Sequence, residues 1–143
     1  MKNKTLKALD RLGQIKRLHM LEKQKTLAEM QAKLKQLHQK IKDITATKAL
    51  EIESCRHDYT SRITLQKYLD GLEIQEKHLK KQLFHLVDFM IPVQESVREA
   101  FREVKSLEIA AENLQTEIRQ ESDKKEQQQL DELSLISKNG NQE

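Results

Sequence analysis

The sequence predicts an all-α fold: a long antiparallel two-helix coiled-coil hairpin whose second helix continues past the first as a C-terminal overhang. Charged residues make up 34% of the chain and apolar residues only 36%, with three Gly and one Pro, a composition typical of long helices rather than of a globular core. Apolar residues follow a heptad repeat along most of the chain. That repeat turns polar once, near its midpoint, where a hairpin has to turn.

The heptad repeat is the main evidence for a coiled coil. With Leu27 assigned to position a, one frame runs without insertion to Ile118, and 22 of its 27 a and d positions are apolar, against about ten expected by chance. A two-helix seam needs only these two positions per heptad to be dry, so a chain this polar can form one. The first part of the seam consists of Leu27, Met30, Leu34, Leu37, Ile41 and Ile44. The second part runs from Leu65 to Ile118.

The interruption between the two parts predicts the turn. Four of the a and d positions in this stretch are polar, namely Lys48, Glu51, Asp58 and Arg62. Thr60 and Ser61 are residue types that cap the start of a helix well. Independently, the midpoint of an apolar seam that starts at Leu6 and ends at Ile118 is residue 62. Both observations place the tip of the hairpin at 58–62.

The expected boundaries follow from this turn. We expect a single coiled-coil domain over 1–136, followed by a disordered tail over 137–143. Within the domain, helix 1 covers about 4–57 and helix 2 about 63–136. Asp70-Gly71 is a turn signal and the alternative tip, although Leu69 and Leu72 stay in frame around it. Pro92 lacks an N–H donor and predicts a kink of the second helix near Asp88.

Charge is distributed unevenly along the chain. Residues 1–42 carry a net charge of +9, residues 43–95 a net of −2, and residues 96–143 a net of −4. The single cysteine, Cys55, excludes an intramolecular disulfide, and no signal peptide or membrane-spanning stretch is visible. We therefore expect a cytoplasmic protein.

Residue patterns that support catalysis or metal binding are missing from the sequence. None of the five histidines has a His or Cys four residues away, so we expect no metal site. A phosphate-binding loop and a nucleophile motif are also absent, so we expect no catalytic residues, no cofactor and no enzymatic activity. Cys55 is interpreted as a seam residue. Leu130, Leu133 and Ile136, in contrast, have no partner helix within the predicted hairpin, which indicates either a binding partner or local disorder.

Three segments of the chain carry distinctive motifs. The start carries Leu12, Lys16-Arg17 and Glu22-Lys23, and a later segment reads REAFREVKSLE over residues 98–108. The ending reads EQQQLDEL over residues 126–133. These segments resemble the flagellar export protein FliJ family, and the ending is similar to that family's terminal Gln-x-x-Leu/Met-Asp-Glu signature. Together these segments extend over nearly the whole chain.

The resemblance implies a specific role in type III protein export. Proteins similar to this family are stalk-like hairpins in the pore of the hexameric export ATPase of flagellum biogenesis and motility. They promote its assembly and activity and contact the cytoplasmic domain of the export gate, so their membrane association is peripheral and only through partners. Export chaperones are a further class of partner that the resemblance raises. The implied localisation is the bacterial cytoplasm, at the inner-membrane export apparatus.

The resemblance also implies site residues. The ATPase-binding residues would be those at the terminal end of the hairpin, namely Arg11, Lys16, Arg17, Lys23, Leu130, Asp131, Glu132 and Leu133. The family's gate-contacting pattern, aromatic-x3-Leu-x2-Ala-x3-His, falls on Tyr68, Leu72, Gln75 and Leu79. Only Tyr68 and Leu72 match it, so the gate contact is carried over for these two. Leu72 is also a d position of the seam, which gives it an alternative interpretation as a core residue.

The sequence is also compatible with two other classes of function. The basic stretch of 1–42 is compatible with a nucleic-acid-binding coiled coil, since neutralising phosphates drives such binding. No aromatic residue is interleaved among its lysines for base stacking, so we do not expect nucleic acid as a partner. The other alternative is a generic structural or tethering coiled coil.

Overall fold

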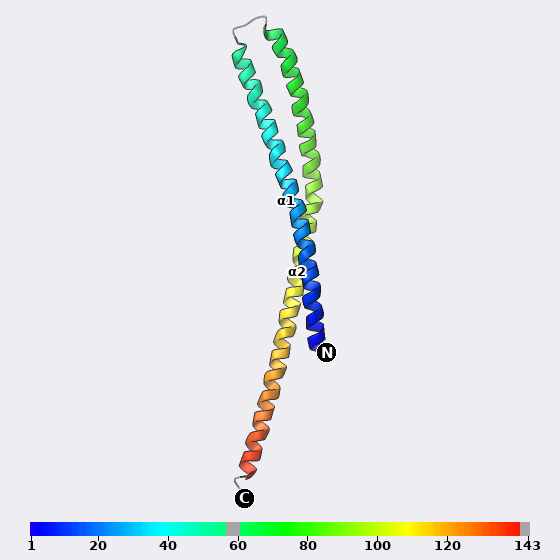
Figure 1. The fold of residues 1–143 in the computed structure, drawn as a ribbon, viewed down its shortest axis with the longest axis vertical. Helices are drawn as coiled ribbons and strands as arrows, with labels where there is room; N and C mark the ends of the chain where they lie inside the picture. Colours follow the sequence, from blue (N-terminus) through cyan, green and yellow to red (C-terminus); the bar gives the residue numbers. More distant parts are fainter. Residues whose placement is uncertain (57–60, 141–143) are drawn as a thin grey trace. The chain divides into compact units, whose positions relative to one another are not determined.

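The fold consists of two long α-helices that pack against each other (Figure 1). This computed structural model describes residues 1–56 and 61–140. Helix α1 spans Lys2–Ser54 and helix α2 spans Ser61–Gly140. Over the described residues the chain contains no β-strand. The predicted all-α helical hairpin is confirmed.

The helix boundaries differ from the expected ones by a few residues. Helix α1 ends three residues before the expected residue 57, and α2 starts two residues before the expected residue 63. Most of the predicted turn, and the candidate cap Thr60, lie outside the described residues. The prediction of a disordered tail from residue 137 is wrong for 137–140, which continue α2. Between Pro92 and Gly140 the chain contains no proline or glycine, and glycine is the residue that most often ends a helix.

The alternative tip at Asp70-Gly71 is excluded, because both residues lie inside α2. Gly71 does not adopt the positive φ that makes glycine valuable in turns. Its neighbours Leu69 and Leu72 are half-buried and buried, so the seam continues through this point. Helix α2 also continues through Pro92. The kink there stays a prediction.

By packing, the chain divides into two compact units. Unit 1 consists of Met1–Met20 and Glu99–Glu143, and unit 2 of Leu21–Arg98. In unit 1, Ala100 and Val104 of α2 are buried, as is Gly13 of α1. Gly13 is an a position when the heptad frame is extended back from Leu27, so the seam does reach into the first turns of α1.

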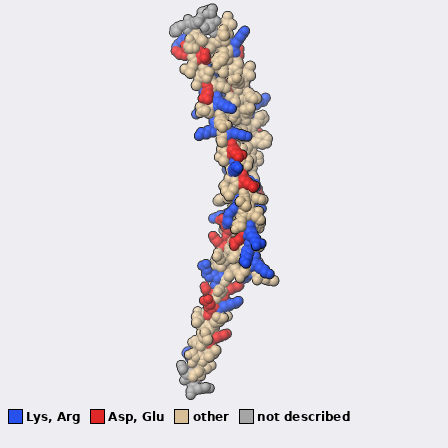
Figure 2. All heavy atoms as spheres, in the orientation of Figure 1, with Lys and Arg blue, Asp and Glu red and all other residues tan. Residues whose placement is uncertain are grey.

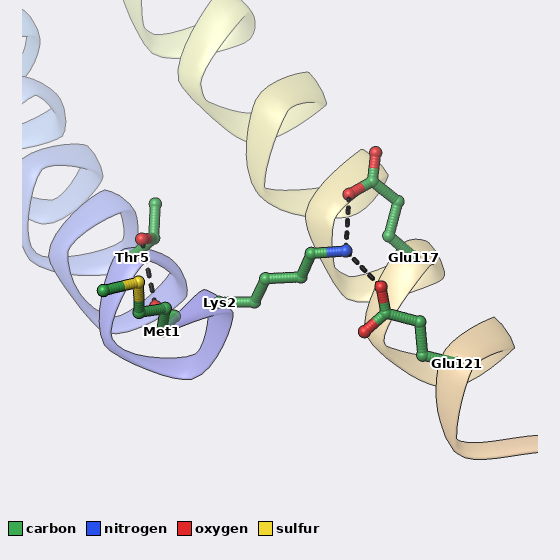
Figure 3. Close-up of polar contacts among 5 residues, drawn as sticks. All are labelled: Met1, Lys2, Thr5, Glu117 and Glu121. Atoms are coloured by element: carbon green, nitrogen blue, oxygen red, sulfur yellow. Dashed lines mark hydrogen bonds and ion pairs between the residues drawn. The ribbon is translucent and has the colours of Figure 1, made fainter. Parts of the chain in front are cut away.

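Ion pairs between the helices of unit 1 define its antiparallel register. The Lys2 ammonium group lies against the Glu117 and Glu121 carboxylates (Figure 3). Further along, Lys16 pairs with Glu103 at 3.1 Å and Arg17 with Glu108 at 3.5 Å. Residue numbers on α1 rise as those on α2 fall, which is the order of an antiparallel pair. All these side chains are at least one-third exposed, so each pair adds little stability.

In unit 2 the a and d positions are again the covered ones. Leu72 and Met90 are buried, and the other apolar a and d residues of this unit are half-buried. A polar contact between the helices also lies inside the seam of this unit. Lys48 of α1 donates a hydrogen bond to Glu76 of α2, and both residues occupy a positions.

The Glu76 carboxylate contacts one lysine from each helix. The side chains of Lys48 and Glu76 are only 25% and 16% exposed, and Lys80 also pairs with Glu76 at 2.9 Å. Hydrogen bonds from Lys48 and then Lys80 lower the pKa of Glu76 from 4.5 to about 2. A polar pair at facing core positions favours one alignment of two helices over shifted ones, because any shift leaves both charges against apolar neighbours.

Two glycines offer a test of helix propensity in this fold. We expect Gly71→Ala and Gly13→Ala each to raise the free energy of unfolding by about 0.5–1 kcal/mol, the cost of glycine relative to alanine inside a helix. A Cβ at Gly71 meets no atom within 4 Å, and one at Gly13 lies 3.9 Å from Arg17 Nη2, an ordinary contact. Urea unfolding followed by circular dichroism measures the change, with Gly140→Ala as a control of small effect. A lower midpoint for Gly13→Ala would show that the contact with Arg17 is not tolerated.

Candidate binding surfaces

The basic residues expected to contact an ATPase are not all available for one. Lys16 and Arg17 are engaged by Glu103 and Glu108 of the same chain. Arg11 and Lys23 are exposed and have no ion-pair partner among residues 1–56 and 61–140. Lys16 also borders a shallow groove of the unit 1 seam that includes Leu12, Arg102 and Leu107. Arg11 and Lys23 are therefore the better candidates for an external contact.

The predicted overhang is present as part of α2. From residue 119 to residue 140 every residue is exposed, and beyond Glu121, which pairs with Lys2, no segment of α1 lies against this stretch within unit 1 (Figure 1). Leu130, Leu133 and Ile136 are more than 60% exposed. At helical spacing they share one side of the helix, and we call these three residues the overhang stripe. Figure 2 shows few charged side chains near the C-terminal end of this helix.

Acidic residues accompany the overhang stripe. Glu126, Asp131 and Glu132 are exposed, and residues 126–136 contain no Lys or Arg. The a and d positions of the heptad frame are mostly polar here, with Lys125, Gln128 and Glu132 among them. The overhang stripe is thus rotated away from the side of α2 that faces α1. It suits a partner that approaches from another direction.

The basic residues of unit 1, namely Arg11, Lys16 and Arg17, form a surface separate from its overhang. Lys16 lies beside Glu103, and 28 residues of continuous helix separate Glu103 from Asp131. At a rise of 1.5 Å per residue this is about 42 Å along α2. A partner that contacts both surfaces must therefore be deep enough to enclose several turns of helix.

The two residues expected to contact the export gate differ in exposure. Tyr68 is 48% exposed, whereas Leu72 is 9% exposed and belongs to the core of unit 2. The burial of Leu72 therefore agrees with its alternative interpretation as a seam residue. Of the two, only Tyr68 is open to a partner in the paired hairpin.

A third surface was not singled out from the sequence. Phe84, Val87 and Ile91 of α2 are 66%, 44% and 59% exposed and share one side of the helix. They occupy b and e positions of the frame. This second apolar spacing beside the a and d seam is the sequence pattern that could have predicted the surface. We call these three residues the flank stripe. An exposed apolar row of this kind is a common feature of protein-binding surfaces.

The described residues hold no set of metal-binding side chains. No group of three or more His, Cys, Asp or Glu comes together in the part of the chain that the structure describes. Cys55 is a half-buried free thiol. No helix among the described residues is long and apolar enough to cross a membrane. What this geometry offers is elongated helical surface for binding other macromolecules.

The pKa shifts outside the seam have simple causes. A hydrogen bond to Glu121 raises the pKa of Lys2, and the same bond lowers the pKa of Glu121. Both groups are exposed, so these shifts reflect a surface ion pair and do not mark a reactive centre.

Searches of the chain against models of known protein families, curated proteins and solved structures found no match.

Proposed function

We propose that this protein is a non-enzymatic stalk that inserts into the hexameric ATPase of a flagellar type III export apparatus and links it to the membrane export gate. The observation that carries the proposal is the overhang, a bare helix with an apolar stripe that extends from a paired hairpin. The segments similar to the FliJ family, over 98–108 and 126–133, support the same assignment.

The mechanism rests on asymmetry. A two-helix stalk cannot present the same surface to six identical subunits, so each subunit meets different charges and shapes. Contacts that differ between the subunits bias which of them closes on nucleotide, by no more than the difference in contact free energy between the open and closed states. Exposed ion pairs are each worth less than about 1 kcal/mol, so several contacts have to act together.

The direct test is ATP turnover by the export ATPase of the same organism with increasing amounts of this protein. We expect turnover to rise with the protein and the effect to weaken at high salt, because screening reduces contacts between exposed charges. Arg11→Glu with Lys23→Glu should reduce the stimulation. Lys25→Glu with Lys40→Glu makes the same charge change at two other exposed lysines and should not. Equal stimulation by all these proteins would count against a basic contact with the ring.

The paired residues need a different variant. Lys16→Glu alone breaks the contact with Glu103 as well as changing the surface, so its effect on stimulation is ambiguous. Lys16→Glu combined with Glu103→Lys keeps an ion pair at this position and reverses only its direction. If the double variant stimulates as weakly as the single one, the ring recognises Lys16 itself.

The gate contact gives an independent prediction. We expect Tyr68→Ala to weaken binding to the cytoplasmic domain of the export gate and to leave ATPase stimulation intact, because Tyr68 is exposed and far along the chain from the overhang. Leu72→Ala, a change in the core, should instead lower the free energy of unfolding by roughly 2–5 kcal/mol. Isothermal titration calorimetry and urea unfolding separate the two effects. Unchanged gate binding by Tyr68→Ala would remove this residue from the contact.

A further inference from the structure

The b and e positions around the flank stripe of unit 2 carry basic residues and no acidic ones. On α1, the b and e positions between residues 21 and 52 include Lys35, His38 and Lys42 and no acidic residue. On α2, the same positions from Lys77 to Arg98 also lack Asp and Glu. Lys35, Lys42 and Lys77 are exposed and make no ion pair with any described residue.

The register of unit 2 brings the lysines of α1 to the level of the flank stripe. Lys48 pairs with Glu76, so ten residues back on α1 corresponds to ten residues forward on α2. This places His38 level with Leu86, and Leu37 and Leu86 indeed border the same groove. The e positions of antiparallel helices lie on one side of the seam, and the b positions adjoin them on the outer surface. Lys35 and Lys42, at b positions, therefore flank the side of unit 2 that carries Val87, at an e position.

A complementary surface exists in the same chain. The overhang stripe spans seven residues of helix and the flank stripe eight, so both are roughly 10 Å long. Glu126, Asp131 and Glu132 accompany the former, and Lys35, Lys42 and Lys77 accompany the latter. Each stripe is apolar, exposed and without a partner helix. The two therefore match in length, in polarity and in the sign of their flanking charges.

We propose that the overhang of one copy docks as a third helix on the flank stripe of unit 2 in a second copy. The occupant comes from a second copy because both stripes lie on α2, which is continuous from Ser61 to Gly140 and cannot fold back on itself. The contact buries apolar side chains of both stripes between opposite charges. It does not depend on the proposed export function.

Sedimentation velocity of the full chain tests this proposal. The contact is small, so association is expected at protein concentrations on the order of 10–100 µM. The mean mass should rise with concentration and fall at high salt, because the flanking charges are exposed. A wild-type chain that stays monomeric throughout this range overturns the proposal.

Charge reversal identifies the surfaces. Lys35→Glu with Lys42→Glu, and Glu126→Lys with Glu132→Lys, should each weaken self-association at least tenfold. An equimolar mixture of these two variants should associate again, since each supplies the native surface that the other lacks. Lys67→Glu with Lys81→Glu makes the same charge change at f positions of α2 and should behave as wild type. Association that survives both reversals, or a mixture that stays monomeric, overturns the proposal.

A crosslink tests proximity directly. In a Cys55→Ser background, chains carrying Val87→Cys and chains carrying Leu133→Cys should form a disulfide-linked heterodimer under mild oxidation. Leu135→Cys, on the opposite side of the overhang, should form it at least tenfold more slowly. The basic face could instead bind an anionic surface, so vesicles containing phosphatidylserine and duplex DNA are tested as well. Binding to either by a chain that remains monomeric, and its loss on reversal of Lys35 and Lys42, would overturn docking between copies.

Discussion

Glu76→Lys is expected to destabilise the hairpin more than any single exposed charge reversal. The substitution places a third ammonium group between Lys48 and Lys80, in a part of the seam where the side chains are mostly covered. Like charges there lose both the hydrogen bonds and the hydration that would screen them. Thermal unfolding followed by circular dichroism should show a clearly lower midpoint for this variant.

Two control variants test whether the loss of stability is specific to the Lys48–Glu76 pair. Glu73→Lys makes the same charge change three residues away, at an exposed residue, and should leave the midpoint almost unchanged. Lys48→Glu combined with Glu76→Lys restores an ion pair across the seam and should recover much of the lost stability. If Glu76→Lys and Glu73→Lys unfold at the same temperature, the seam pair contributes nothing to stability.

The same pair predicts a dependence on acid. The pKa of Glu76 is lowered in the folded protein from 4.5 to about 2, so the unfolded chain binds the proton more tightly. The contribution of Glu76 to stability is therefore complete above about pH 4.5 and is lost as pH falls toward 2. The difference in unfolding midpoint between wild type and Glu76→Gln should shrink over this interval. A difference that stays constant from neutral to acidic pH would contradict this assignment.

Removal of residues 126–143 is expected to abolish most of the ATPase stimulation while leaving the fold intact. The deleted segment contains Leu130 and Leu133, each of which gains about 1.5–3 kcal/mol when fully buried in a partner. A loss of this size raises the concentration needed for half-maximal stimulation at least tenfold, since a factor of ten corresponds to about 1.4 kcal/mol. Turnover assays with the truncated and the full chain measure the change.

Point variants distinguish the apolar contact from the mere length of the helix. Leu130→Gln with Leu133→Gln should reproduce most of the effect of the truncation, whereas Leu135→Gln, which lies outside the overhang stripe, should not. The unfolding midpoint should remain close to that of wild type in every case, because this part of α2 packs against no other helix of unit 1. Full stimulation by the truncated chain would show that the ring does not recognise the overhang.

Much of the fold could be predicted from the sequence because a coiled coil is encoded locally. Apolar residues at a and d positions predicted which side of each helix is covered, and these positions are the covered ones from Leu65 to Ile118. The same pattern predicted the bare overhang, because a hairpin that turns near residue 60 leaves no part of α1 to pair with the residues of α2 after Ile118. The extent of α2 beyond residue 136 was missed, because polar residues without Gly or Pro are compatible with either a helix or a tail.

The sequence by itself determined the helices, their apolar side and the overhang, whereas the tertiary structure decided which residues meet. A heptad pattern repeats every seven residues, so it is equally compatible with several registers and does not select a partner for any polar residue. Only the observed register pairs Lys48 with Glu76. It also engages Lys16 and Arg17 with acidic residues that are distant in sequence, and leaves Arg11 and Lys23 open to a partner.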